Sequence, residues 1–248
     1  MRYCIIFAYD GTAYHGWQRQ PNAPTVQQML EEALQTVLRS EISVVGAGRT
    51  DTGVHARMMA AHFDVDEEID CDFLVFKLNC LLPHDIAVSE VRAVPDDWHA
   101  RFSALARTYR YYIGTRKDAF NHHTLRLYFP LNIERMNEAA ALLLSHQDFG
   151  CFCKSHSDNK TNLCTVSEAR WTQSDDSTLV FTITANRFLR NMVRAIVGTL
   201  IEVGKGKMSI ADFAQVLQSG KRTEAGESVP ARGLFLESIS YPPDEKDE

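Results

Sequence analysis

The sequence predicts an α+β protein with a largely antiparallel sheet. In the first half, the expected elements follow the order strand, helix, strand, strand, helix, strand, which is the order of a ferredoxin-like (RRM-like) unit. The second half can be read in a similar way. Neither half shows the strict strand–helix alternation of a doubly wound parallel sheet. At 248 residues we expect two ferredoxin-like halves, 1–103 and 104–248, which form an extended sheet with helices on one side and a central cleft.

The elements of the first half follow from apolar patterning. Residues 2–9 alternate as a strand that is apolar on both faces, so we expect it to be central and covered on both sides. Thr25 is a typical N-cap, and Gln28 completes a capping-box pattern before a helix that extends to Arg39. The remaining elements of this half are a strand over 42–45, a strand over 60–65, a helix over 70–80 and a strand over 86–94.

The second half has the same kinds of element, although its sequence shows no repeat of the first half. The expected strands are 106–114, 125–129, 165–172, 179–185 and 234–240. The expected helices are 133–145, 188–203 and 209–218. A duplicated architecture is therefore predicted from element order alone.

Composition excludes several classes of protein. Hydrophobic residues make up 45% and charged residues 23% of the chain, which excludes a mainly disordered, collagen-like or coiled-coil chain. No apolar run approaches the roughly 18 residues of a membrane helix. The N-terminus turns polar at Asp10, too early for a signal peptide. We therefore expect a cytoplasmic protein that does not bind membranes.

The six cysteines show no CxxC spacing, so we expect free thiols in a reducing compartment. Cys151, Cys153, Cys164 and His156 could also be read as a metal site. The usual two- to four-residue gaps between ligands are absent, which argues against that reading.

The net charge of −6 argues at first against a nucleic-acid partner, but the acids are concentrated. Residues 64–72 carry −6 and the tail 244–248 carries −3, so the rest of the chain carries +3. Of the 26 basic residues, 18 are arginine, the better bidentate ligand for phosphate. A local basic cleft is compatible with this distribution, and so are scattered surface arginines.

The densest polar stretch is a glycine-rich loop over 46–57. It presents one carboxylate, Asp51, beside Arg49, Arg57 and His55. We expect Asp51 to stay ionised because nearby cations favour the charged form. Such a carboxylate can act as nucleophile, base or metal ligand, and the same residues also fit an ordinary Asp-x-Gly turn.

Three further segments combine arginines with aromatic residues. Over 98–112, Arg107, Tyr109 and Tyr111 share one face of a strand, which suits base stacking or a half-buried strand. Over 186–194, helical spacing places Arg187, Arg190 and Arg194 within about 60° of one another, so that one of them could reach Asp51. The loop 11–20 is polar and aromatic, as nucleic-acid contacts often are.

Together these segments resemble the tRNA pseudouridine synthase A family. The motif Gly48-Arg49-Thr50-Asp51-Thr52-Gly53-Val54-His55 is similar to the family's catalytic motif, and the other matching motifs extend over nearly the whole chain. They are Tyr14-His15-Gly16-Trp17-Gln18-Arg19-Gln20, Leu82-Pro83-x-Asp85-Ile86, His99-Ala100-Arg101-Phe102, Arg107-x-Tyr109-Arg110-Tyr111, Met192-Val193-Arg194 and Ala231-x-Gly233-Leu234. One departure is Met58-Met59, where the family commonly has Gly-Gln.

The resemblance implies isomerisation of uridine to pseudouridine at about positions 38, 39 and 40 in the anticodon arm of tRNA. It also implies a homodimer that needs neither cofactor nor metal. Asp51 would be the nucleophile, Tyr109 would stack on the extruded base, and Arg194 would pair with Asp51. The further residues implied to contact tRNA are Arg49, His55, Arg19, Arg101, Arg107, Arg110, Arg190 and Leu234.

Two other functions use the same residues. A non-catalytic RNA-binding protein could use the basic cleft, although it would not need the complete Asp51 motif. A hydrolase acting on a small nucleoside could use the carboxylate, although it would not need so many dispersed arginines. For the isomerase itself, the sequence leaves open whether the carboxylate adds to C6 of the base or to C1′ of the sugar.

Overall fold

The computed structural model describes residues 1–154 and 160–243, and it confirms the α+β class. These residues contain nine strands and five α-helices, and most strand pairs are antiparallel. The acidic tail 244–248 and His156 lie outside the described residues. The chain divides into two compact units, Met1–Leu105 with Phe235–Glu248, and Ala106–Leu234. The halves predicted from the sequence, 1–103 and 104–248, differ from these units in the last segment, and their folding as separate domains stays a prediction.

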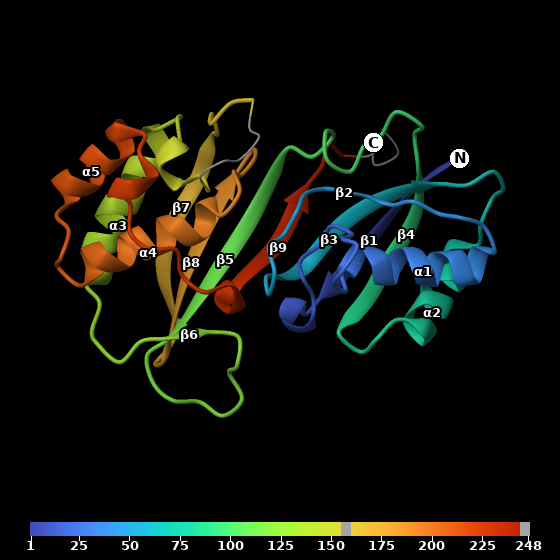
Figure 1. Cartoon of the computed structure of the whole chain (residues 1–248), viewed down its shortest axis with the longest axis horizontal. Coiled ribbons are helices and arrows are strands. Elements are labelled where there is room, and N and C mark those ends of the chain that lie inside the picture. Colours follow the sequence, from blue (N-terminus) through green and yellow to red (C-terminus); the bar gives the residue numbers. More distant parts are fainter. Residues whose placement is uncertain (155–159, 244–248) are drawn as a thin grey trace. The chain divides into compact units, whose positions relative to one another are not determined.

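The first unit has the predicted order of elements (Figure 1). They are β1 (Arg2–Tyr9), α1 (Val26–Leu38), β2 (Val45–Gly46), β3 (His55–Asp64), α2 (Cys71–Leu81), β4 (Ile86–Val94) and, from the end of the chain, β9 (Leu234–Ser240). Strand β1 lies between β3 and β4 and is antiparallel to both. The short β2 pairs with β3, and β9 runs parallel to the start of β3.

The core of the first unit lies between this sheet and the helices α1 and α2, which lie side by side (Figure 1). One face of β1 is buried as predicted, through Tyr3, Ile5, Phe7 and Tyr9. The other face is only partly covered, because Ile6 and Ala8 stay half-exposed. The side chain of Thr25 accepts a hydrogen bond from the backbone N–H of Gln28, so the predicted cap of α1 is confirmed.

Two boundaries in this unit differ from the prediction. The expected strand 42–45 shrinks to two residues, since Ile42 and Val44 are buried by packing and not by strand pairing. Strand β3 begins at His55, five residues before the predicted start at Ala60, because the glycine-rich turn ends sooner than its composition indicates.

The second unit contains β5 (Ala106–Gly114), β6 (Leu125–Arg126), α3 (Ile133–Ala141), β7 (Val166–Asp175), β8 (Thr178–Ala185), α4 (Met192–Gly204) and α5 (Ile210–Ser219). Its strands lie in the order β6-β5-β8-β7, with only β6 parallel to its neighbour. The three helices pack against one another (Figure 1). Ser209 and Asp212 form a capping box at the start of α5.

The helix predicted over 188–203 begins four residues late, at Met192. Asn191 has a φ of 67°, in the left-handed region, so the preceding residues do not continue the helix. The predicted helical stripe of Arg187, Arg190 and Arg194 is therefore wrong, because only Arg194 lies on α4. The helix that remains is apolar on nearly every side and is almost wholly buried.

All six cysteines are free, as predicted, and four of them are buried. Burial raises the pKa of the Cys151 thiol to about 12 and that of Cys164 to about 11. These thiols are therefore protonated and unreactive at neutral pH. In the parts of the chain that the structure describes, every helix is too short or too polar to cross a membrane.

Candidate active site

Asp51 lies on a tight turn between β2 and β3. The backbone N–H of Val54 donates to the carbonyl oxygen of Asp51 at 3.1 Å, which closes the turn. Gly53 has a φ of 75°, a conformation that favours glycine at the third position of such a turn. The Asp51 side chain is half-exposed, Thr50 before it is buried and Arg49 is exposed. The turn therefore presents a carboxylate on a fixed backbone.

The loop after β1 holds this turn in place. The N–H of Trp17 donates to the carbonyl oxygen of Thr50 at 3.2 Å, and the N–H of Gly53 donates to that of Tyr14 at 3.4 Å. The hydroxyl groups of Tyr9 and Thr50 lie 2.8 Å apart in a buried hydrogen bond. Thr50 and Gly53, on either side of Asp51 in the turn, are thus held by the chain between Tyr9 and Trp17.

The aromatic residues of this loop face inward, contrary to the prediction that they contact nucleic acid. Tyr14 and Trp17 are 5% and 3% exposed. The Tyr14 hydroxyl donates to Asp85 Oδ1 at 2.6 Å. Burial raises the pKa of Tyr14, and the bond to Asp85 raises it further. The loop supports the Asp51 turn through its buried residues, and its polar residues are exposed to solvent.

His55 is also buried, with 1% of its surface exposed. Its Nδ1 lies 3.1 Å from the backbone nitrogen of Gly11 and 2.9 Å from Asp10 Oδ1. Its ring stacks on Phe235, with 4.5 Å between the centroids. This environment fits a residue that holds the loop after β1, and it does not fit the predicted contact with tRNA.

Arg19 and Arg101 are exposed, as an RNA ligand must be. Arg19 Nη1 donates to Glu31 Oε2 at 2.9 Å. The guanidinium carbon of Arg101 lies 5.5 Å from the centroid of the Phe102 ring. The neighbouring Phe102 is 75% exposed, so this pair offers a cation and an aromatic surface together.

In the second unit, Tyr109 stands on β5 opposite Ile183 of β8. Its half-exposed ring meets the edge of Phe188 at a centroid distance of 5.1 Å. Tyr111, predicted on the same face, is fully buried and donates to the carbonyl oxygen of Pro230 at 2.9 Å. On this face of β5, Tyr109 is therefore the accessible aromatic residue, and Tyr111 belongs to the core.

The arginines around Tyr109 differ in their surroundings. Arg107 Nη1 donates to the carbonyl oxygen of Asn186 at 2.8 Å, and Arg110, on the other face of β5, is half-exposed. Arg190 is exposed and lies in the segment before α4. Leu234 is 5% exposed at the start of β9. These positions agree with contacts to a phosphate backbone for the arginines and with packing for Leu234.

Arg194 lies in the first turn of α4 and is half-exposed. Its Nε donates to the carbonyl oxygen of Val229 at 2.7 Å, and the N–H of Val229 donates back to the carbonyl oxygen of Arg194 at 3.2 Å. The direction of the side chain is therefore fixed within its own unit.

Comparison with known proteins identifies the class. A family model described as tRNA pseudouridine synthase matches residues 5–103 and 139–242. The chain is 54% identical over 243 residues to the tRNA pseudouridine synthase A of Bacteroides fragilis, covering 97% of this chain and 96% of that protein. It is 53% identical over 247 residues to the protein of the same name from Porphyromonas gingivalis, covering 98% of each.

The chain therefore belongs to the tRNA pseudouridine synthase family, whose members isomerise uridine to pseudouridine in tRNA. It is accordingly an isomerase. The matched segments include Asp51 and Arg194, and Tyr109 lies between them.

The sequence did not reveal the polar residues that hold the loop 11–20 and the Asp51 turn. Glu31 is 7% exposed, although it stands among the apolar positions of α1. A charged residue on the buried face of a helix was the available signal, since such residues are seldom buried without a partner. Tyr9 and Asp85 gave no comparable signal, because their partners lie more than 40 residues away.

Proposed function

We propose that this chain converts uridine to pseudouridine in the anticodon arm of tRNA, at about positions 38, 39 and 40, with Asp51 as the nucleophile. The observation that carries the proposal is the half-exposed Asp51 carboxylate on a turn fixed by Val54, Trp17 and Tyr14, within a segment that matches the family. A carboxylate on a fixed backbone is a nucleophile that is already oriented before the reaction begins.

The reaction is an isomerisation. The bond between N1 and C1′ breaks, the base rotates, and C5 forms a bond to C1′. The hydrogen on C5 leaves as a proton and N1 gains one, so no redox partner is required. Asp51 can assist by adding to C6 of the base or to C1′ of the sugar, and both routes release the enzyme at the end. The resemblance implies neither cofactor nor metal.

The target uridine lies in a structured RNA and must be extruded, which costs a few kcal/mol and calls for a replacement stacking surface. We assign this role to Tyr109, whose half-exposed ring is braced by Phe188. We assign to Arg194 the task of pairing with Asp51, by the resemblance and because its direction is fixed by Val229.

The phosphate backbone requires cations. We propose Arg19, Arg49, Arg101, Arg107, Arg110 and Arg190 as tRNA ligands, since each has an exposed or half-exposed side chain. His55 and Leu234 are buried, and we give them a positioning role. We further propose that the enzyme is a homodimer, as the resemblance implies, and that it is cytoplasmic, as the composition and the N-terminal segment indicate.

A single assay tests this function against the two alternatives. A tRNA transcript labelled with tritium at uridine C5 is incubated with the enzyme, and tritium in water and free uracil are measured. Formation of pseudouridine releases tritium without free uracil. Release of uracil from free uridine, incubated in parallel, would indicate a hydrolase. Binding of the tRNA, measured separately, with neither product would indicate a non-catalytic RNA-binding protein.

A further inference from the structure

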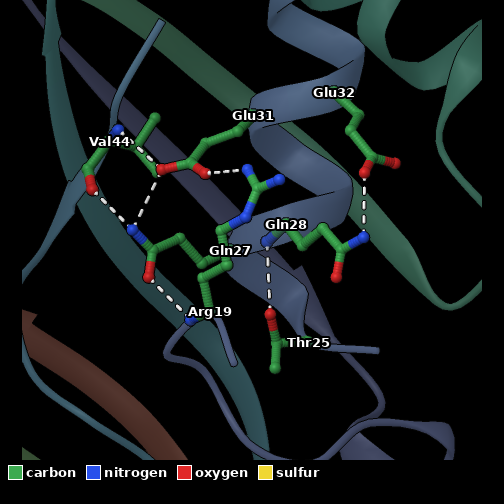
Figure 2. A network of polar contacts seen from close by, with 7 residues as sticks. All are labelled: Arg19, Thr25, Gln27, Gln28, Glu31, Glu32 and Val44. Carbon is green, nitrogen blue, oxygen red and sulfur yellow. Dashed lines mark hydrogen bonds and ion pairs between the residues drawn. The ribbon is translucent and has the colours of Figure 1, made fainter. Parts of the chain in front are cut away.

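Glu31 on α1 is a buried carboxylate with a complete set of partners (Figure 2). Its side chain is 9% exposed. Oε2 accepts from Arg19 Nη1 at 2.9 Å, and Oε1 accepts from Gln27 Nε2 at 3.0 Å and from the N–H of Val44 at 3.2 Å. A buried charge persists only when it is paired and hydrogen-bonded. Both oxygens satisfy that condition, so the network is a built feature and not a chance surface contact.

The partner of Glu31 is held at two points and is still accessible. The backbone N–H of Arg19 donates to Gln27 Oε1 at 2.9 Å, while its side chain bonds to Glu31 (Figure 2). More than half of the Arg19 side chain, 55%, remains exposed. Of the three guanidinium nitrogens of Arg19, only Nη1 has a hydrogen-bond partner among the described residues. The rest of the planar fork faces solvent, which suits bidentate contact with a phosphate.

From this geometry we infer that Glu31 is a positioning residue for tRNA binding, which holds Arg19 in the orientation that a backbone phosphate requires. The inference rests on the proposed function, in which Arg19 contacts tRNA. A freely rotating arginine side chain loses conformational entropy when it binds a phosphate, which lowers the affinity by up to about 30-fold. An arginine that is already held in the binding orientation avoids this loss.

The sign of the effect separates positioning from simple electrostatics. Glu31 is negative and so repels tRNA at long range, which means that removing its charge should strengthen binding if charge alone matters. If Glu31 orients Arg19, removing its charge should weaken binding. Glu32, the next residue of α1, provides a matched control: it is exposed and accepts one bond, from Gln28 Nε2 at 2.9 Å (Figure 2).

The informative variant is Glu31→Gln. The oxygen of the new amide can still accept hydrogen bonds from Val44 and Gln27. In that orientation, the NH2 group of the amide faces Arg19 Nη1. Two donors then face each other, so Arg19 is released while the helix remains anchored. We expect the tRNA dissociation constant to rise about fivefold, within the limit set by the rotamer entropy of arginine. The single-turnover rate at saturating tRNA should not change, because no reacting atom is touched.

A double-mutant cycle completes the test. Arg19→Ala should weaken tRNA binding about tenfold and reduce the salt dependence by about one phosphate contact. If Glu31 acts through Arg19, adding Glu31→Gln to Arg19→Ala should change the dissociation constant by less than about twofold. Glu32→Gln should leave binding unchanged or slightly tighter. Binding by Glu31→Gln that is as tight as that of Glu32→Gln, or fully additive effects in the cycle, would overturn the inference.

A second variant covers the case in which Glu31→Gln does not fold. Arg19→Lys keeps the charge and the ion pair but lacks the planar fork, and we expect about threefold weaker binding with an unchanged salt dependence. Wild-type affinity in Arg19→Lys and in Arg19→Ala would overturn the inference while tritium release by the wild type still supports the proposed function. Failure of the wild type to release tritium would instead refute the function.

Discussion

Gly16 supports the Asp51 turn through a close approach of two backbones. It has a φ of 88°, and a Cβ built on it would lie 2.5 Å from the carbonyl oxygen of Thr50 and 3.2 Å from the carbonyl carbon of Asp51. The obstacle is main chain and not a flexible side chain. Replacing Gly16 by alanine therefore must displace either the loop or the turn that carries Asp51.

The size of the effect follows from two contributions. An L-residue in the left-handed region costs about 1 to 2 kcal/mol. In addition, the distance of 2.5 Å must grow to at least about 3.0 Å, since non-bonded carbon and oxygen atoms do not approach more closely. A shift of about 1 Å in a reacting group lowers the rate by about a hundredfold. For a shift of about half that size we expect Gly16→Ala to lower the single-turnover rate by about tenfold.

Tritium release under single-turnover conditions measures this rate, and a binding assay with the same tRNA should give a dissociation constant within about threefold of the wild type. Gly206→Ala is the matched control. Gly206 has a φ of 74°, but no described atom lies within 4 Å of its Cβ position. This control should lose about 1 kcal/mol of stability and keep the full rate. A folded Gly16→Ala enzyme with the wild-type rate would refute the view that this contact sets the position of Asp51.

Two further predictions concern pH and salt. Burial, followed by the charges of Arg2 and His99, lowers the pKa of His62 to about 4, and its Nδ1 accepts from the N–H of Ala100 at 3.2 Å. As the pH drops below about 6.5, His62 takes up a proton more readily in the unfolded chain than in the folded protein, so the free energy of unfolding should decrease, by about 1 to 2 kcal/mol at pH 5. Chemical denaturation should show a smaller decrease for His62→Gln than for the wild type. An equal decrease in both proteins would contradict this prediction. The association constant for tRNA should decrease steeply as the salt concentration rises, with a slope of about −4 in a log–log plot for about five phosphate contacts. A slope shallower than about −1 would mean that the arginines do not bind phosphate.

Local patterning predicted those elements whose residues satisfy one rule throughout. The strands Arg2–Tyr9 and Ile86–Val94 have the expected bounds, because turn residues follow the first strand and lie on both sides of the second. Ile42 to Val45 has the same apolar character, yet only its last residue is in a strand. Burial without strand pairing gives the same sequence pattern, so composition cannot separate the two.

The start of α4 shows a second limit. Phe188 and Leu189 continue the helical period, but the positive φ of Asn191 delays the helix to Met192. Periodicity describes which side chains are buried and carries no information about the backbone angle of one residue. For that reason the prediction of an arginine stripe on this helix was wrong.

For the site, the family motif points to Asp51, and nothing in the local sequence shows what holds it. The support comes from Tyr9, Tyr14 and Trp17, which precede the turn by more than 30 residues. The pairing of Arg19 with Glu31 also depends on how the loop returns to the helix. Contacts of this kind are set by tertiary structure, which a single sequence does not display.

The assignment of the Asp51 carboxylate as the nucleophile is tested by the substitution Asp51→Asn. The variant keeps the size of the side chain and the phosphate contacts, so it should bind tRNA within about tenfold of the wild type and release less than about 1% of the wild-type tritium in a single turnover. The variant must be freshly purified, because slow deamidation would restore aspartate. Tritium release well above that level by a protein shown to retain asparagine would contradict the assignment.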